Sequence, residues 1–195
     1  LSDKTEAEVY HGNALDFGYG NPVSERDEFQ IGDLSLKTLE TPGHTFESIS
    51  VALFDPNFGD KAVGVFTGDA LFIGDVGRTD FFPDQAEHVA GLLYDSIFEK
   101  ILPLGDQVIL YPAHGAGSVC GSGMASREFS TLGYERMFNP SLQKTDRDEF
   151  IQYKVNEKHY QPPYFKMMEK YNQQGPPLTG LPSVLPVLSS KEFER

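Results

Sequence analysis

The sequence has little cysteine, few basic residues and no long apolar run. A single cysteine, Cys120, excludes an internal disulfide framework. No stretch approaches the roughly 20 consecutive apolar residues that a membrane-spanning helix needs, and the first residues do not resemble a signal peptide. Because 29 acidic residues outnumber 16 basic ones, the net negative charge repels nucleic acid and anionic lipid. We therefore expect a cytoplasmic protein that binds neither nucleic acid nor membranes.

Hydrophobic residues make up 39% of the 195 residues, which is enough for one globular domain with an appendage. Apolar residues alternate with polar ones over 34–37 and 48–53, and this alternation predicts two half-buried strands. Unbroken apolar runs over 62–66 and 107–111 predict two inner strands that are covered on both faces.

Two helices are expected between and after these strands. Apolar residues at helical spacing predict one helix over 84–100, with Asp84 as its N-cap. The second is expected from residue 146 to about residue 159, with a capping box that Thr145 opens. Strands that alternate with surface helices indicate an α/β fold.

Prolines become frequent after residue 159 and exclude any helix longer than a short one over 164–172. From residue 188 the sequence resembles the start of another helix. We therefore expect one domain over 1–160, a proline-rich linker over 161–187, and the start of a further domain over 188–195.

Three short segments combine metal-binding side chains with Gly or Pro turns and follow predicted strands: 41–45, 67–72 and 111–115. Loops at strand ends are where side chains from distant segments converge, so His44, Asp69 and His114 are expected to meet around one cation. An isolated histidine is usually structural, but three such segments together favour a metal site. Imidazole and carboxylate ligands suit Zn(II) or Fe(II) and leave coordination positions open.

In this order along the chain, the three segments resemble three successive metal motifs of the metallo-β-lactamase superfamily. The resemblance implies a four-layer αββα sandwich with metal ligands on loops at one edge of its sheets, and this chain would be its C-terminal half. It also implies that His44 and Asp69 bind metal. His114 would bind a second metal in dinuclear members and stay nearby in mononuclear ones.

Segments 68–72 and 75–80 resemble the glyoxalase II and persulfide dioxygenase branches of the superfamily more than true β-lactamases. Four further segments resemble the persulfide dioxygenases that are fused to rhodaneses: 114–121, 130–136, 139–140 and 163–165. This resemblance implies that dioxygen oxidises a low-molecular-weight persulfide, typically glutathione persulfide, to sulfite and thiol at a mononuclear Fe(II). It also implies a rhodanese domain C-terminal to the linker. Zn(II) is the alternative metal.

The first metal motif of the superfamily, His-x-His-x-Asp-His, is absent from the sequence. We expect the chain to begin downstream of it, so that the metal site lacks a ligand, binds metal weakly and leaves the chain with little activity. A sandwich without its first strands exposes apolar sheet surface, which predicts a homo-oligomer. Two rival functions stay open: a glyoxalase II-like thioester hydrolase with a dinuclear centre, and a non-catalytic oligomerisation fragment.

Three further residues are candidates for substrate binding. Arg78 either grips a substrate carboxylate or pairs internally with Asp80, and a turn this close to the metal favours the internal pair. Cys120 is either a small apolar filler or an exposed thiol of lowered pKa that carries a persulfide. Tyr111 either lines the substrate entrance or packs in the core.

Overall fold

The computed structural model describes residues 2–175, and the chain divides after Tyr160 into two compact units. The first unit holds a six-stranded sheet, a smaller sheet and helices α1 (Ser2–Thr5) to α4 (Arg147–Val155). The second unit contributes α5 (Phe165–Gln174), close to the short helix expected over 164–172. The end of the expected linker and the expected start of a further domain over 188–195 lie outside the described residues.

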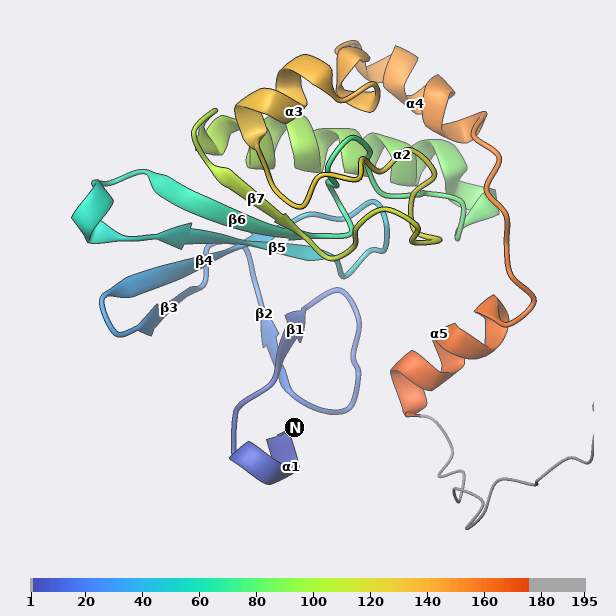
Figure 1. The fold of residues 1–195 in the computed structure, drawn as a ribbon. Helices are drawn as coiled ribbons and strands as arrows, with labels where there is room; N and C mark the ends of the chain where they lie inside the picture. Colours follow the sequence, from blue (N-terminus) through green and yellow to red (C-terminus); the bar gives the residue numbers. More distant parts are fainter. Residues whose placement is uncertain (1, 176–195) are drawn as a thin grey trace, which may run out of the picture. The chain divides into compact units, whose positions relative to one another are not determined.

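The larger sheet is antiparallel except for one parallel pair (Figure 1). Its strands, in spatial order, are β3 (Glu28–Ile31), β4 (Leu34–Glu40), β5 (Ile49–Phe54), β6 (Ala62–Gly68), β7 (Ile109–Pro112) and β8 (Ser130–Thr131). The pair β6–β7 is parallel because the chain crosses between these strands through α2 (Ala86–Asp95). The four strands expected from the sequence correspond to β4, β5, β6 and β7. The sequence analysis missed β3, β8 and the separate parallel pair of β1 (Tyr10–Gly12) and β2 (Asn21–Val23).

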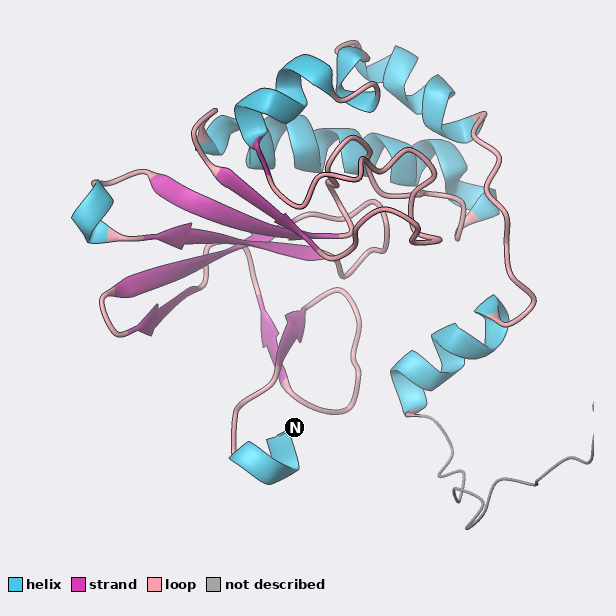
Figure 2. Ribbon diagram, in the orientation of Figure 1, coloured by secondary structure: helices cyan, strands magenta, loops and turns pink. Residues whose placement is uncertain are grey.

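Helices α2, α3 (Leu132–Phe138) and α4 lie on one face of the larger sheet (Figure 2). Val65 of β6 and Leu110 of β7 belong to one buried cluster with Leu93 and Ile97 from the α2 region and Phe150 of α4. Burying each of these side chains contributes roughly 1.5–3 kcal/mol. This helix-covered face therefore holds the core. No helix within residues 2–175 has both the length and the apolar character that crossing a lipid bilayer requires.

The ends of the two expected helices differ from the prediction. Asp84 is not an N-cap, because it lies in a 3₁₀ turn, Pro83–Gln85, that precedes α2. The helical path then continues beyond α2 as a π-helical turn, Ser96–Ile101.

The expected capping box at Thr145 is also wrong. Asp146 caps α4, since its carboxylate accepts a hydrogen bond from the Glu149 backbone N–H at 2.9 Å. The Thr145 carbonyl accepts a hydrogen bond from the Tyr94 hydroxyl at 2.5 Å, a contact that ties the residue before the cap to α2.

The opposite face of the sheet, here called the open face, carries exposed apolar side chains. Phe66 is 46% exposed and stacks on Tyr111, which is 41% exposed, at a centroid distance of 5.0 Å. Val51 pairs with Phe66, and Phe66 pairs with Tyr111, so all three share this face. Ile109 is 38% exposed. The prediction that the inner strands are covered on both faces is therefore wrong for residues 2–160, where α2, α3 and α4 cover one face and leave Phe66, Ile109 and Tyr111 exposed on the other.

We expect the chain to associate with itself through the open face, since exposed apolar side chains on adjacent strands favour burial against another surface. Replacing both Phe66 and Tyr111 with threonine keeps β propensity and should shift the protein toward monomer. Phe58 is 79% exposed in the 3₁₀ turn that joins β5 to β6, outside the paired strands, so Phe58→Thr is the matched control and should leave association unchanged. Light scattering over a concentration series measures the mass. A parent chain that stays monomeric at high concentration would contradict this expectation.

Candidate metal centre

Three strand ends bring the candidate ligands to one edge of the sheet. Because β4 and β6 are both antiparallel to β5, and β7 is parallel to β6, the C-terminal ends of β4, β6 and β7 lie at the same edge. His44, Asp69 and His114 each follow one of these ends within a few residues. His44 Nε2 lies 3.8 Å from Asp69 Oδ1, and His114 Nε2 lies 3.1 Å from the same oxygen. The structure thus places all three side chains together.

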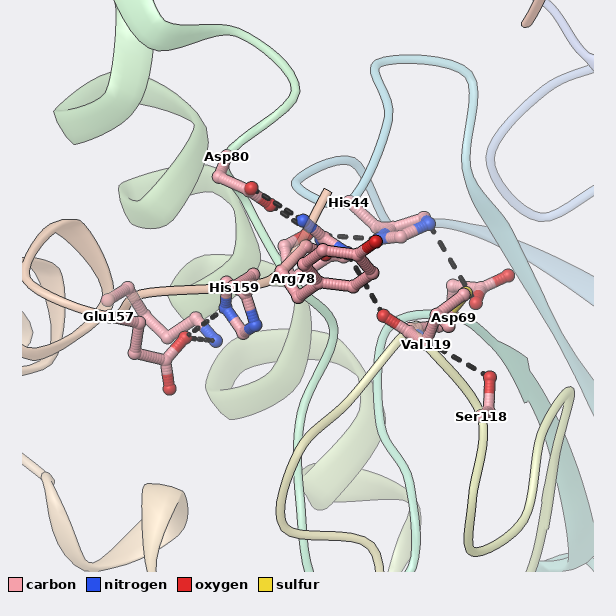
Figure 3. A network of polar contacts seen from close by, with 11 residues as sticks. His44, Asp69, Arg78, Asp80, Ser118, Val119, Glu157 and His159 are labelled. Carbon is pink, nitrogen blue, oxygen red and sulfur yellow. Dashed lines mark hydrogen bonds and ion pairs between the residues drawn. The ribbon is translucent and has the colours of Figure 1, made fainter. Parts of the chain in front are cut away.

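The ring of His44 is held in one orientation. Its Nδ1 lies 2.9 Å from the carbonyl oxygen of Arg78 and donates a hydrogen bond to it, since a carbonyl can only accept (Figure 3). This leaves Nε2, without a proton in the neutral ring, facing Asp69. Burial lowers the pKa of His44 below its usual value, so the neutral form that ligates metals is favoured. The ring also meets Phe81 edge to face.

The carboxylate of Asp69 has the property expected of a metal ligand. Its Oδ1 is buried and has no hydrogen-bond partner among the described residues, although two imidazole nitrogens lie near it. An ionised oxygen in such a position costs free energy unless a cation or a donor compensates it. The donor set of imidazole nitrogen and carboxylate oxygen fits Fe(II) or Zn(II).

The turn that carries Asp69 is tightly packed against the following segment. The Gly77 backbone N–H donates to the Ala70 carbonyl at 3.1 Å, and the Thr67 hydroxyl donates to the Leu71 carbonyl at 2.7 Å. A Cβ atom at Gly77 would lie 2.0 Å from the carbonyl oxygen of Asp69, so only glycine fits at this position. The segment that follows Asp69 thereby fixes its backbone.

Arg78 connects several parts of the site. Its side chain is fully buried, and its Nε and Nη2 donate to the two carboxylate oxygens of Asp80, both at 2.6 Å. Nη1 donates to the carbonyl oxygens of Val119 at 3.0 Å and Tyr160 at 3.4 Å. The internal pairing with Asp80 is the one observed, and substrate contact would require this network to open. Arg78 thus positions His44 through its carbonyl and the loop of Cys120 through its guanidinium.

Cys120 lies closer to the metal candidates than its sequence position suggests. One ligand atom each of His44, Asp69 and Cys120 lie within 4.8 Å of one another. The thiol is half-buried, and burial raises its pKa above the usual value. The expectation of an exposed thiol of lowered pKa is therefore wrong. Tyr111, the third expected substrate contact, stacks on Phe66 on the open face and does not pack in the core. Its contact with a substrate stays a prediction.

The sequence analysis missed two acidic residues that hold the surrounding loops. Asp75 accepts a hydrogen bond from the Gly123 backbone N–H at 2.8 Å, which ties the Cys120 loop to the turn after Asp69. Glu135 is fully buried and accepts from the Gly74 backbone N–H at 2.7 Å and from Asn139 Nδ2 at 3.1 Å. Neither residue stands in a pattern that predicts the contacts with Gly123 and Gly74, because these backbone N–H donors lie 48 and 61 residues away in sequence.

Two solved structures resemble this chain closely. A metallo-β-lactamase from Staphylococcus aureus superposes with a TM-score of 0.82 at 34% identity, covering 96% of this chain and 57% of that one. ETHE1 from Myxococcus xanthus superposes with a TM-score of 0.71 at 31% identity, covering 89% of this chain and 68% of that one. The mixed α/β fold and its sheet-edge loops therefore place this chain in the metallo-β-lactamase superfamily, to which it belongs.

Within the superfamily, persulfide dioxygenases of the ETHE1 type are homologues of this chain. The mitochondrial persulfide dioxygenase ETHE1 of Bos taurus is 36% identical over 120 residues, which cover 62% of this chain and 40% of that protein. Hydroxyacylglutathione hydrolase of Dictyostelium discoideum is 31% identical over 97 residues, which cover 50% of this chain and 34% of that protein. The chain spans less than half the length of the curated relatives that it matches. No protein-family model matches the chain.

Proposed function

We propose that the complete protein is a metal-dependent persulfide dioxygenase that acts on a low-molecular-weight persulfide of the glutathione type. In this reaction a persulfide, dioxygen and water give the thiol, sulfite and two protons, so the outer sulfur loses four electrons and dioxygen gains them. The observation that carries the proposal is the convergence of the His44 and His114 imidazoles on the buried Oδ1 of Asp69, which accepts no hydrogen bond of good geometry from the described residues. Homology to proteins named persulfide dioxygenase supports the reaction class.

His44 and Asp69 are the residues of this chain that would hold Fe(II), because their donor atoms face each other at the sheet edge. Bound iron would supply the redox chemistry and a template for both reactants. The buried hydrogen bond from His44 Nδ1 to the Arg78 carbonyl keeps the ligating nitrogen aimed at the site. The side chain of His114 is 37% exposed and lies 3.1 Å from Asp69 Oδ1, so it borders the site on the side that is open to solvent.

Two ligands bind a first-row metal weakly, and the superfamily's His-x-His-x-Asp-His sequence is absent from this chain. The proposal therefore concerns the complete gene product, in which the remaining iron ligands would lie outside these residues. We also propose that a rhodanese domain is the partner of this domain in the complete gene product, outside the residues of this chain.

The proposal is tested by oxygen uptake of the complete gene product, loaded with Fe(II) and supplied with glutathione persulfide. We expect one sulfite for each dioxygen consumed. Asp69→Asn should lose this uptake, and Asp106→Asn should retain it. The Asp106 carboxylate is a matched control because it is 70% exposed and pairs with Arg136 away from the sheet edge. Uptake no greater than that of Fe(II) and persulfide alone would reject the proposal.

A glyoxalase II-like thioester hydrolase is the second candidate, favoured by the homology to hydroxyacylglutathione hydrolase. In that case His114 would belong to a second metal, and a dinuclear centre would lower the pKa of bound water. The two candidates differ in their need for dioxygen. Cleavage of a hydroxyacylglutathione thioester by the zinc-loaded protein under anaerobic conditions would favour the hydrolase.

A further inference from the structure

Cys120 reaches the metal candidates from a loop that is 51 residues beyond Asp69 in the sequence. The ligand atoms of Cys120, His44 and Asp69 lie within 4.8 Å of one another. His44 is only 9% exposed and presents Nε2 to this group, and the buried Asp69 Oδ1 has no hydrogen-bond partner among the described residues. A buried imidazole and a buried carboxylate oxygen, which accepts no hydrogen bond of good geometry from the described residues, thus lie at the place that the thiol borders.

We propose that Cys120 is itself a metal ligand, so that His44, Asp69 and Cys120 form a three-ligand site for a thiophilic divalent cation such as Zn(II). The proposal rests on the metal site of the proposed function, but not on its persulfide chemistry. It assigns a third ligand inside this chain. A nitrogen, an oxygen and a sulfur donor leave the fourth tetrahedral position open, as in zinc sites that bind a water or a substrate.

The distances are compatible with this coordination. Tetrahedral Zn(II) with bonds of about 2.0–2.3 Å keeps its ligand atoms roughly 3.3–3.6 Å apart. His44 Nε2 and Asp69 Oδ1, at 3.8 Å, already have nearly that separation. Closing the remaining distances requires Cys120 to move by roughly 1 Å toward the other two. Cys120 lies in a loop between β7 and β8, outside any helix or strand, so such a movement breaks no regular element.

Two contacts hold the Cys120 loop on the side of the site, and a third lies within the loop. Arg78 Nη1 donates to the carbonyl of Val119, the residue directly before the thiol, at 3.0 Å. The Cys120 backbone N–H donates to the Ser118 hydroxyl at 3.2 Å, and the Gly123 backbone N–H donates to Asp75 at 2.8 Å. The buried side chains of Arg78 and Asp75, in the segment that follows Asp69, therefore help to position the sulfur, as hydrogen-bonded neighbours of the ligands do in metal sites.

The net charge of the three ligands and the softness of the thiolate both favour Zn(II). A carboxylate, a thiolate and a neutral imidazole carry two negative charges, which one divalent cation balances, and the thiol proton is released to solvent on binding. A thiolate ligand favours Zn(II), and oxygen-rich sites favour harder ions. His114 approaches Asp69 from beside this group, at 3.1 Å, and can support the carboxylate without ligating the ion.

The test replaces Zn(II) with Co(II), whose spectrum reports its ligands, in the full chain and in Cys120→Ser. We expect the parent protein to show a sulfur-to-cobalt charge-transfer band in the near ultraviolet, and the variant to lose it and bind the ion at least tenfold more weakly. Val119→Ala is the matched control, because it keeps the backbone carbonyl that Arg78 contacts, and it should retain the band. X-ray absorption of the zinc form should show one sulfur at about 2.3 Å.

A second measurement needs no variant. Cys120 is the chain's single cysteine, so we expect Zn(II) to slow its alkylation by iodoacetamide at least tenfold in the parent protein. Cobalt visible through its d–d bands without a charge-transfer band, together with an unchanged alkylation rate, would overturn the proposal. This test is independent of oxygen uptake. A protein that shows the sulfur-to-cobalt band but consumes no oxygen would support Cys120 as a ligand and reject only the proposed dioxygenase function.

Discussion

Replacing Arg78 with methionine is expected to lower the free energy of unfolding by about 3 kcal/mol. The guanidinium is fully buried and forms a two-pronged ion pair with Asp80, and removing it breaks both hydrogen bonds of that pair. The expected loss lies at the lower end of the range for buried pairs, because the Asp80 side chain is 28% exposed and water can partly compensate it. Urea unfolding followed by circular dichroism measures the change.

The same substitution should also loosen the candidate metal centre. Without the guanidinium, the Val119 carbonyl loses its donor, and we expect Cys120 to be alkylated faster in folded Arg78→Met protein than in the parent. Arg78→Lys keeps the charge but cannot donate to both oxygens of Asp80 at once. We therefore expect its free energy of unfolding to lie between those of the parent and Arg78→Met.

Arg136→Met is the matched control for stability. Arg136 pairs with Asp106 at 3.0 Å on the surface, where both side chains are largely exposed. Surface pairs contribute roughly 0–1 kcal/mol. If Arg78→Met were no more destabilising than Arg136→Met, the buried network around Arg78 would not hold the site together.

Local sequence patterns predict much of the sheet and the ligand-bearing loops, because these features depend on neighbouring residues. Alternating or continuous apolar runs predict β4 to β7, and Gly and Pro turns after strands predict where His44, Asp69 and His114 lie. Sequence patterns do not predict which side chains of β5 face the helices. Ser50 and Ala52 are buried beneath the helices, whereas Val51 and Leu53 lie on the open face and are only half-buried. Alternation shows that two faces differ, but not which face the helices cover.

Contacts between distant residues explain what sequence patterns could not supply. The pairing of Arg78 with Asp80 is local and was expected, but its contact with Val119 spans 41 residues. The approach of Cys120 to Asp69 likewise depends on the path of a long loop. A capping pattern at Thr131, whose hydroxyl accepts from the Tyr134 backbone N–H, was present in the sequence and could have predicted α3.

Replacing Asp69 with asparagine is expected to abolish metal binding while leaving the metal-free fold as stable as the parent or more so. The substitution keeps the shape of the side chain and removes the charge that a divalent cation requires. Because Oδ1 is buried without a well-directed hydrogen bond and has only nearby imidazole nitrogens to compensate its charge, removing that charge relieves part of a desolvation cost, and a gain of up to about 1 kcal/mol is expected in metal-free urea unfolding. Residues selected for binding are often destabilising in this way.

With metal present, the order of stability should reverse, so that the parent is more stable than Asp69→Asn. Zn(II) at a hundred times its dissociation constant stabilises a protein that binds it only when folded by about 2.7 kcal/mol. We expect this shift in the thermal unfolding of the parent and of Asp106→Asn, and none in Asp69→Asn at the same concentration. If Asp69→Asn were less stable without metal and still stabilised by Zn(II), the carboxylate would be a structural group and the metal would bind elsewhere. The sign of the change in metal-free stability on Asp69→Asn therefore distinguishes two roles. A gain indicates a metal ligand whose burial costs the fold free energy, and a loss indicates a side chain that stabilises the fold.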